Sequence, residues 1–125
     1  MPKLTSPKNM SLFLTGGTGF IGSHFIEASL LNGHEVVALK RPQSSPAIGL
    51  SKQPDWVIGD LEAYPESSFQ GCDTLIHLAS FGVDPKDSSN WEQCLRWNVS
   101  ASFKLWESAI QAGVKRLIIC GSCFE

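Results

Sequence analysis

The stretch Leu12-Phe13-Leu14-Thr15-Gly16-Gly17-Thr18-Gly19-Phe20-Ile21-Gly22 decides how this chain folds. An apolar run ends at Thr15, glycines stand at positions 16, 17, 19 and 22, and the residues that follow have helical spacing. Gly16 can turn where a side chain would clash, Gly19 lets the main chain approach an anion, and Gly22 lets the helix pack closely on the strand. The free N–H groups of that helix would then point at a phosphate. Strand, glycine loop and helix together predict a pyrophosphate-binding turn; a glycine turn without a ligand is the alternative.

The composition is that of one globular domain. The chain has 125 residues, 42% of them hydrophobic and 18% charged, with a formal net charge of −2. This length allows one core but no separate substrate domain. The slight negative charge argues against a nucleic-acid surface, and no apolar run is long enough to span a membrane. The N-terminus lacks the apolar centre of a signal peptide, so we expect a cytoplasmic location.

Short apolar segments alternate with helical segments along the chain. We expect strands over 11–15, 35–39, 55–58, 73–78 and 116–120, helices over 20–31 and 90–112, and one or two helical turns within 61–70. This alternation predicts an α/β fold with a doubly wound, Rossmann-like parallel sheet of about five strands in the order 3-2-1-4-5. Residues 1–9 are expected to form a flexible arm and residues 10–125 the domain itself.

The long second helix carries most of the large aromatic side chains. One stripe at helical spacing is expected to face the sheet: Trp91, Leu95, Val99, Ser102, Trp106 and Ala109. Trp97 and Phe103 would then lie on the other side, as a partner surface or beneath further structure. The last strand would be left as an unpaired edge.

The four cysteines leave one further alternative. Cys120 and Cys123 have the CxxC spacing of a redox or metal pair, but Cys72 and Cys94 do not form a second such pair. A structural zinc site needs four ligands, and a redox cysteine needs an exposed helix start, whereas Cys120 ends an apolar run. We therefore expect no metal site, and buried or incidental cysteines.

Five landmarks in order carry a resemblance to a known family. They are the glycine signature Thr15–Gly22, the acidic turn Gly59-Asp60-Leu61, the strand Asp73–Ala79, the helical motif Trp97-Asn98-Val99 and the strand Val114–Ser122. Over residues 10–125 the chain resembles the extended short-chain dehydrogenase/reductase superfamily, and within it the NAD(P)-dependent epimerase/dehydratase family. The match points to a superfamily more strongly than to any one substrate.

The resemblance implies a set of cofactor contacts. The pyrophosphate would meet main-chain groups of the glycine loop and helix start, at Gly16, Gly19, Phe20, Ile21 and Gly22. Asp60 would approach the adenine amino group and Leu61 would supply a backbone contact, although an Asp here can also simply form a turn. The nicotinamide ribose would lie against residues at the end of the fourth strand, namely Leu78, Ala79 and Ser80.

The end of the second strand indicates which dinucleotide binds. A carboxylate there would bind the adenosine 2′-hydroxyl and indicate NAD, whereas a cation accommodates the 2′-phosphate of NADP. This chain has Lys40 followed by Arg41 at that point. A guanidinium binds phosphate oxygens in a fork, so NADP is favoured over NAD. A solvated basic pair is the alternative.

The residues expected to act on a substrate are incomplete. By resemblance, Ser122 would hydrogen-bond the reacting substrate oxygen, and Asn98 would either organise the active-site backbone or be merely structural. His77, inside a buried strand, is expected to be a satisfied core histidine. The family's catalytic Tyr-x-x-x-Lys pair is missing, because the single tyrosine, Tyr64, is followed four residues later by Ser68. The chain ends at Glu125, about where that motif would begin.

Two functions are consistent with these features. The chain is expected to be the dinucleotide-binding N-terminal portion of an NAD(P)-dependent epimerase, dehydratase or reductase whose full-length form acts on a nucleotide-linked sugar. Such enzymes commonly form homodimers through helices packed side by side. The alternative is a non-catalytic NAD(P)-binding module that turns nothing over by itself.

Overall fold

A computed structural model of the chain describes residues 9–82, 86 and 90–121. The strands are β1 (Ser11–Thr15), β2 (Glu35–Lys40), β3 (Asp55–Ile58), β4 (Thr74–His77) and β5 (Arg116–Ile119). The helices are α1 (Phe20–Leu31), the 3₁₀ turn η1 (Glu66–Phe69), and a long helix made of α2 (Trp91–Cys94), the π-helical η3 (Leu95–Ser100) and α3 (Ala101–Gln111). Each predicted element is therefore present, and the predicted ends of the strands and of the two helices differ from the observed ones by at most one residue.

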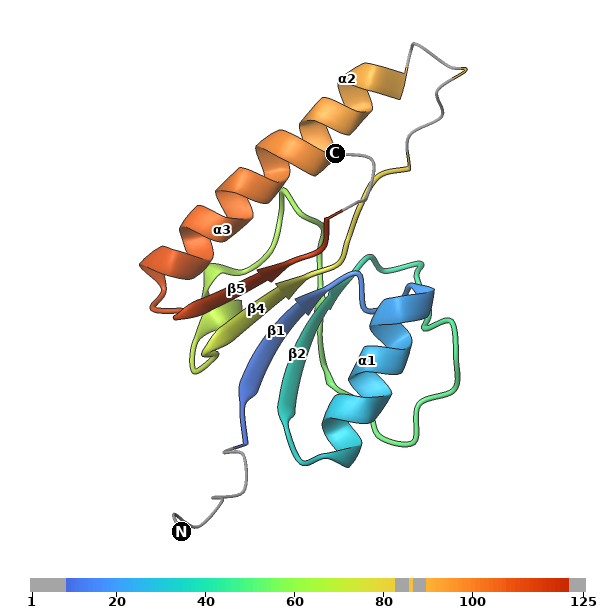
Figure 1. Ribbon diagram of the computed structural model, residues 1–125, viewed down its shortest axis with the longest axis vertical. Helices are drawn as coiled ribbons and strands as arrows, with labels where there is room; N and C mark the ends of the chain where they lie inside the picture. Colours follow the sequence, from blue (N-terminus) through green and yellow to red (C-terminus); the bar gives the residue numbers. More distant parts are fainter. Residues whose placement is uncertain (1–8, 83–85, 87–89, 122–125) are drawn as a thin grey trace, which may run out of the picture.

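All five strands are parallel, in the order β3-β2-β1-β4-β5, which confirms the predicted sheet. Leu14 of β1 stands beside Ala38 of β2 on one side and Ile76 of β4 on the other. The order reverses at β1, because the chain first moves outward through β2 and β3 and then returns to β4. Figure 1 shows α1 on one face of the sheet and the long helix toward the other.

The alternating side chains of β1 divide the core into two layers. Leu12 and Leu14 pack with Ile26 of α1, whereas Phe13 packs on the opposite face with Leu105 of α3 and Phe69 of η1. The rings of Phe13 and Phe69 have their centroids 4.5 Å apart. A strand buried on both faces requires a continuous apolar run, which is why residues 12–14 are all hydrophobic.

The prediction for the face of the long helix was wrong in its first half. The buried residues there are Cys94, Ala101, Ser102, Leu105 and Ala109, whereas Trp91 and Leu95 are each 58% exposed and Val99 is 44% exposed. In Figure 1, α2 extends past the carboxyl ends of β4 and β5, so its residues have no sheet to cover. The wider turn of η3 also interrupts the 3.6-residue period assumed for the stripe. Phe103 lies on the exposed side of the helix, as predicted. Trp97 was predicted to lie there too but is only partly exposed.

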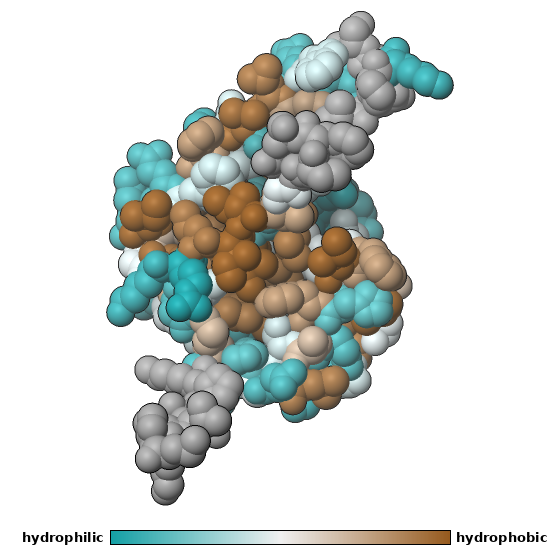
Figure 2. Space-filling model, in the orientation of Figure 1, coloured by the Kyte–Doolittle hydropathy of each residue, from teal (hydrophilic) through white to brown (hydrophobic). Residues whose placement is uncertain are grey.

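The sheet ends at β5 among the residues that the structure describes, because β5 pairs with β4 alone. Ile118 and Ile119 are nearly half exposed. A groove of about 380 Å³ runs between α1 and β5, lined in part by Leu12, Phe25 and Ile118, and Figure 2 shows hydrophobic side chains gathered on this side of the sheet. Over the described part of the chain, no helix is long and apolar enough to cross a membrane.

The aromatic packing around Phe69 predicts a large contribution to stability. Phe69 is 1% exposed and also contacts the ring of Tyr64 at 5.6 Å. Phe69→Ala should lower the free energy of unfolding by about 3–5 kcal/mol, measured by urea denaturation, because it leaves a cavity beneath η1. Phe20→Ala is the control: Phe20 is 72% exposed, so its loss should cost no more than about 0.5 kcal/mol. Equal effects of the two variants would contradict this packing.

Candidate functional site

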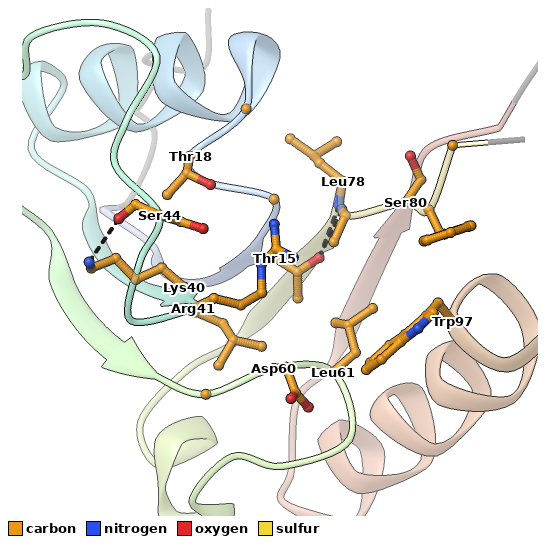
Figure 3. Close-up of a pocket in the computed structure, with 17 residues that line it drawn as sticks. Thr15, Thr18, Lys40, Arg41, Ser44, Asp60, Leu61, Leu78, Ser80 and Trp97 are labelled. Carbon is orange, nitrogen blue, oxygen red and sulfur yellow. Dashed lines mark hydrogen bonds between the residues drawn. The ribbon is translucent and has the colours of Figure 1, made fainter. Parts of the chain in front are cut away.

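A cleft of about 700 Å³ opens at the carboxyl ends of the strands. Its walls come from the glycine loop and from the ends of β2, β3 and β4 (Figure 3). Open α/β sheets bind their ligands outside the carboxyl ends of the strands, where the strand order reverses. The cleft brings together nine of the predicted site residues: Gly16, Gly19, Lys40, Arg41, Asp60, Leu61, Leu78, Ala79 and Ser80.

Three main-chain segments meet at the glycine loop with no room for side chains. A Cβ on Gly22 would lie 1.9 Å from the carbonyl oxygen of Gly16. Gly16 itself has a φ of +76°, and a Cβ there would lie 2.7 Å from the nitrogen of Ala79. These glycines therefore place the start of α1 directly over the end of β1, with the residues after β4 alongside.

The start of α1 leaves main-chain N–H groups for an anion. Gly19 precedes the helix without a side-chain cap, and the first turn contains no acidic residue. The side chains of Phe20 and Ile21 are 72% and 65% exposed. Phe20, Ile21 and Gly22 do not line the cleft itself, and contact of their main chain with a ligand stays a prediction. A helix N-terminus of this kind favours a phosphate through its N–H groups and its dipole.

The two basic residues after β2 differ in their surroundings. The Nζ of Lys40 donates a hydrogen bond to the carbonyl oxygen of Ser44 at 3.0 Å and lies 5.9 Å from the centre of the Trp56 ring. Lys40 thus holds the loop that carries Ser44 (Figure 3). Arg41 is exposed, lines the cleft and makes no ion pair within the described residues. Arg41 is therefore the basic group that remains available to a ligand.

Asp60 shapes the turn after β3. Its Oδ1 accepts hydrogen bonds from the main-chain N–H groups of Glu62 at 2.8 Å and Ala63 at 2.9 Å. A Cβ on Gly59 would lie 2.3 Å from the carbonyl oxygen of Ala63, so the turn closes tightly. The turn-forming role that the sequence left open is thus present. Asp60 and Leu61 also line the cleft, and contact with an adenine stays a prediction.

His77 is buried and hydrogen-bonded at both ring nitrogens, as expected of a core histidine. Its Nδ1 lies 2.6 Å from Thr15 Oγ1, and its Nε2 lies 2.9 Å from Ser102 Oγ. Thr15 Oγ1 also accepts the main-chain N–H groups of Leu78 and Ala79, each at 3.2 Å. Burial lowers the pKa of His77, which favours the neutral ring.

Asn98 holds the main chain beside the cleft but does not line the cleft. Its Oδ1 accepts the N–H of Phe81 at 2.7 Å, and its Nδ2 donates to the carbonyl oxygen of Phe81 at 2.9 Å. Asn90 donates to the carbonyl oxygen of Gly82 at 3.0 Å. Asn98 is therefore placed to organise the backbone of residues 81–82, which do line the cleft.

Trp97 is a cleft residue that sequence reasoning missed. Its Nε1 donates to Gln93 Oε1 at 3.2 Å, and the Arg96 guanidinium lies 4.8 Å from its ring centre. Arg96 in turn donates to Glu62 at 2.9 Å, a hydrogen bond that lowers the pKa of Glu62 and raises that of Arg96. Figure 3 shows the Trp97 ring pointing toward Leu61 at one end of the cleft. Its position next to Asn98 in the helical motif was the one signal in the sequence.

Of the remaining residues considered in the sequence, some lie within the described part of the structure and some lie outside it. Ser122, expected to contact substrate, and Cys123, the second cysteine of the CxxC pair, lie outside the described residues. Cys72 and Cys94 are buried free thiols, and Cys120 is an exposed one; burial raises the pKa of the Cys72 thiol. Within residues 9–82, 86 and 90–121, no three His, Cys, Asp or Glu side chains gather as metal ligands.

Solved structures resemble this fold over most of the chain. A UDP-glucose-4-epimerase from Stenotrophomonas maltophila, solved with bound NAD and formylated UDP-arabinopyranose, superposes with a TM-score of 0.79 at 26% identity, covering 93% of this chain and 38% of that one. MoeE5, solved in complex with UDP-glucose and NAD, superposes with a TM-score of 0.75 at 31% identity, covering 90% of this chain and 36% of that one.

Sequence comparison gives the family. The putative dihydroflavonol 4-reductase of Synechocystis is 35% identical over 112 residues, which are 88% of this chain and 32% of that protein. The chain thus spans about a third of the length of these relatives. The model of the NAD dependent epimerase/dehydratase family matches residues 12–125, which include all five landmarks. The chain therefore belongs to the NAD-dependent epimerase/dehydratase family.

Proposed function

We propose that this chain binds a nicotinamide dinucleotide in the cleft, as the cofactor-binding portion of an enzyme that acts on nucleotide-linked sugars. The observation that carries this proposal is the close approach of the Gly22 and Gly16 main chains: a Cβ on Gly22 would lie 1.9 Å from the carbonyl oxygen of Gly16. This close approach places the start of α1 over the end of β1, beside the cleft, where a pyrophosphate would meet main-chain N–H groups. When bound, the nicotinamide would accept or return a hydride.

The rest of the dinucleotide would follow the strand ends. The adenine half would lie toward β3, between Asp60 and Leu61, and the nicotinamide half toward β4, against Leu78, Ala79 and Ser80. Asn98 would act indirectly, since its amide bonds hold Phe81 rather than face the cleft. These roles rest on family membership and on the position of each residue in the cleft.

We further propose that NADP is preferred over NAD. Support comes from the absence of a carboxylate at the end of β2 and from Arg41, which is exposed and lines the cleft. Lys40 would act mainly by holding the loop at Ser44. Both relatives with bound cofactor described above hold NAD, so the preference for NADP rests on the basic residues alone.

The proposed substrate and the proposed role of Ser122 concern the full-length protein rather than the cleft alone. Two similar structures hold UDP-sugars, which supports a nucleotide-linked sugar as the substrate of the full-length protein. Ser122 would hydrogen-bond its reacting oxygen. Because this chain contains no Tyr-x-x-x-Lys pair, a binding module without turnover is the second candidate function. A cytoplasmic location stays a prediction.

The exposed face of the long helix supports a homodimer. Trp91, Leu95, Val99 and Phe103 follow one another at intervals of four residues, and each is between 44% and 61% exposed. Monomeric soluble proteins rarely expose so continuous an apolar stripe. A second copy with the same stripe would bury it in a symmetric helix pair.

Cofactor binding should depend on the absence of a side chain at Gly22. Gly22→Ala should weaken NADPH binding at least tenfold by isothermal titration, because the added Cβ would push α1 away from Gly16. Gly49→Ala is the matched control, since a Cβ there meets nothing within 4 Å. Failure of the unmodified chain to bind NADPH or NADH would contradict the proposal. Turnover of a 4-keto sugar nucleotide by this chain alone would exclude the module alternative.

Arg41 should set the dinucleotide preference. Arg41→Ala should weaken NADPH binding about tenfold and leave NADH binding nearly unchanged, because only the 2′-phosphate gains from the guanidinium. Arg116→Ala is the control: Arg116 is exposed at the amino end of β5, lines the groove beside α1, and should alter neither affinity. An unchanged ratio of the two affinities in Arg41→Ala would show that NADP is not preferred.

The dimer should depend on the helix stripe. Leu95→Glu should shift the chain from dimer to monomer in analytical ultracentrifugation, raising the dimer dissociation constant at least tenfold, because it buries a charge in an apolar interface. Leu31→Glu serves for comparison, since Leu31 on α1 is 61% exposed and Leu95 is 58% exposed. A chain that stays monomeric at tens of micromolar would rule out this interface.

A further inference from the structure

We propose that His77 is a positioning residue for the cleft. It joins the residues that follow β4 to the π-helical turn at Trp97, through one directed chain of hydrogen bonds. The inference rests on the proposed function for the identity of the ligand, although the hydrogen-bond chain itself does not.

The donor-to-acceptor direction of the hydrogen-bond chain follows from Thr15. Its hydroxyl oxygen accepts hydrogen bonds from the N–H groups of Leu78 and Ala79, the first of which is shared with the Thr15 carbonyl oxygen at 3.2 Å. A hydroxyl has two acceptor lone pairs and one proton to donate. The Thr15 proton must therefore go elsewhere, and His77 Nδ1 lies 2.6 Å away. Because Nδ1 accepts this proton, it carries none of its own.

The other ring nitrogen completes the order of donors. With Nδ1 acting as acceptor, the neutral ring carries its proton on Nε2 and donates it to Ser102 Oγ at 2.9 Å. Ser102 then donates its own hydroxyl proton to the carbonyl oxygen of Trp97 at 3.3 Å. His77 is 6% exposed and both hydroxyl residues are 2% exposed or less, so no water competes for these protons. In this direction every group of the hydrogen-bond chain is satisfied.

The first end of the chain fixes the floor of the cleft. Leu78 and Ala79 line the cleft, and a Cβ on Gly16 would lie 2.7 Å from both the Leu78 carbonyl carbon and the Ala79 nitrogen. A shift of these residues would therefore press on the glycine loop that is expected to hold the pyrophosphate. Thr15 holds them through two N–H groups, and His77 determines that its lone pairs face them.

The second end fixes the wall of the cleft. Ser102 closes the wide turn of η3 by bonding the carbonyl of Trp97, five residues before it. Trp97 lines the cleft, and the next residue, Asn98, holds both main-chain groups of Phe81. Isolated π-helical turns occur frequently at functional sites. His77 thus connects two segments of the cleft that lie about twenty residues apart in the chain.

These contacts distinguish a positioning role from a merely satisfied core histidine. A core histidine needs only partners for its nitrogens, and any two polar groups would serve. Here both partners, Thr15 and Ser102, are buried side chains that make further hydrogen bonds to main chain at the cleft, to the N–H groups of Leu78 and Ala79 and to the carbonyl oxygen of Trp97. The ring also packs edge-on against Trp106 at 6.1 Å, which restricts its rotation.

The decisive experiment removes the link without altering a cleft side chain. In Ser102→Ala, the amide resonances of Trp97 and Phe81 should move, and the NADPH dissociation constant should rise about 3- to 10-fold, the loss expected for one or two buried hydrogen bonds. Ser29→Ala is the matched control: Ser29 is a 6% exposed helical serine on α1, beside the groove that contains Leu12 and Thr74. It should leave the Phe81 resonance in place and the dissociation constant within twofold.

Two further measurements test the two ends of the hydrogen-bond chain separately. The ¹⁵N shifts of the His77 imidazole should show the neutral ring with its proton on Nε2. His77→Asn, whose amide oxygen can still accept from Thr15, should keep the Ala79 resonance near its original position while that of Phe81 moves. His77→Leu should move both.

The outcomes decide the inference separately from the proposed function. A ring protonated on Nδ1 would overturn it. It would also fail if Ser102→Ala moved the Phe81 resonance no more than Ser29→Ala does. If the unmodified chain binds no dinucleotide, the proposed function fails, but the tautomer and the Ala79 and Phe81 resonances still decide whether His77 positions the cleft.

Discussion

The main-chain contact between Gly22 and Gly16 is the constraint on which the cleft depends. No Cβ fits at either position, since it would lie 1.9 Å from the carbonyl of Gly16 in one case and 2.7 Å from Ala79 in the other. Because these glycines remove the side chains, α1, the end of β1 and the residues after β4 can all meet at one point. The start of α1 then lies beside the cleft formed by the other strand ends, where a helix N-terminus favours an anion.

Buried or half-buried polar side chains hold the main chain around this space. Thr15 binds the N–H groups of two residues after β4, Asp60 those of two residues after β3, and Asn98 both groups of Phe81. A buried polar side chain is costly unless it is fully hydrogen-bonded. These residues therefore fix the cleft more rigidly than apolar packing alone would, and they leave main-chain groups and a few side chains to meet a ligand.

The fold and much of the site followed from local patterns in the sequence. An apolar run buried on both faces, a glycine loop and a helix of twelve residues define β1 and α1 without reference to distant residues. Parallel strands bring their carboxyl ends to one edge, so residues that follow different strands, such as Arg41, Asp60 and Ala79, had to lie near one another. The same reasoning could not say whether a residue faces the cleft or supports it, as Asn98 shows.

By itself, the sequence determined the order of the elements, the parallel doubly wound sheet and the edge of the sheet where the cleft lies, because these depend on periodicity, on the alternation of elements and on glycine positions; the strand order followed from the resemblance to a known family. Only the tertiary structure decided which face of the long helix is buried, because α2 extends beyond the sheet and η3 departs from the α-helical period. It alone placed Trp97 in the cleft and separated the role of Lys40 from that of Arg41. It also joined Thr15, His77 and Ser102, because hydrogen bonds between residues 25 to 62 positions apart leave no pattern in the sequence.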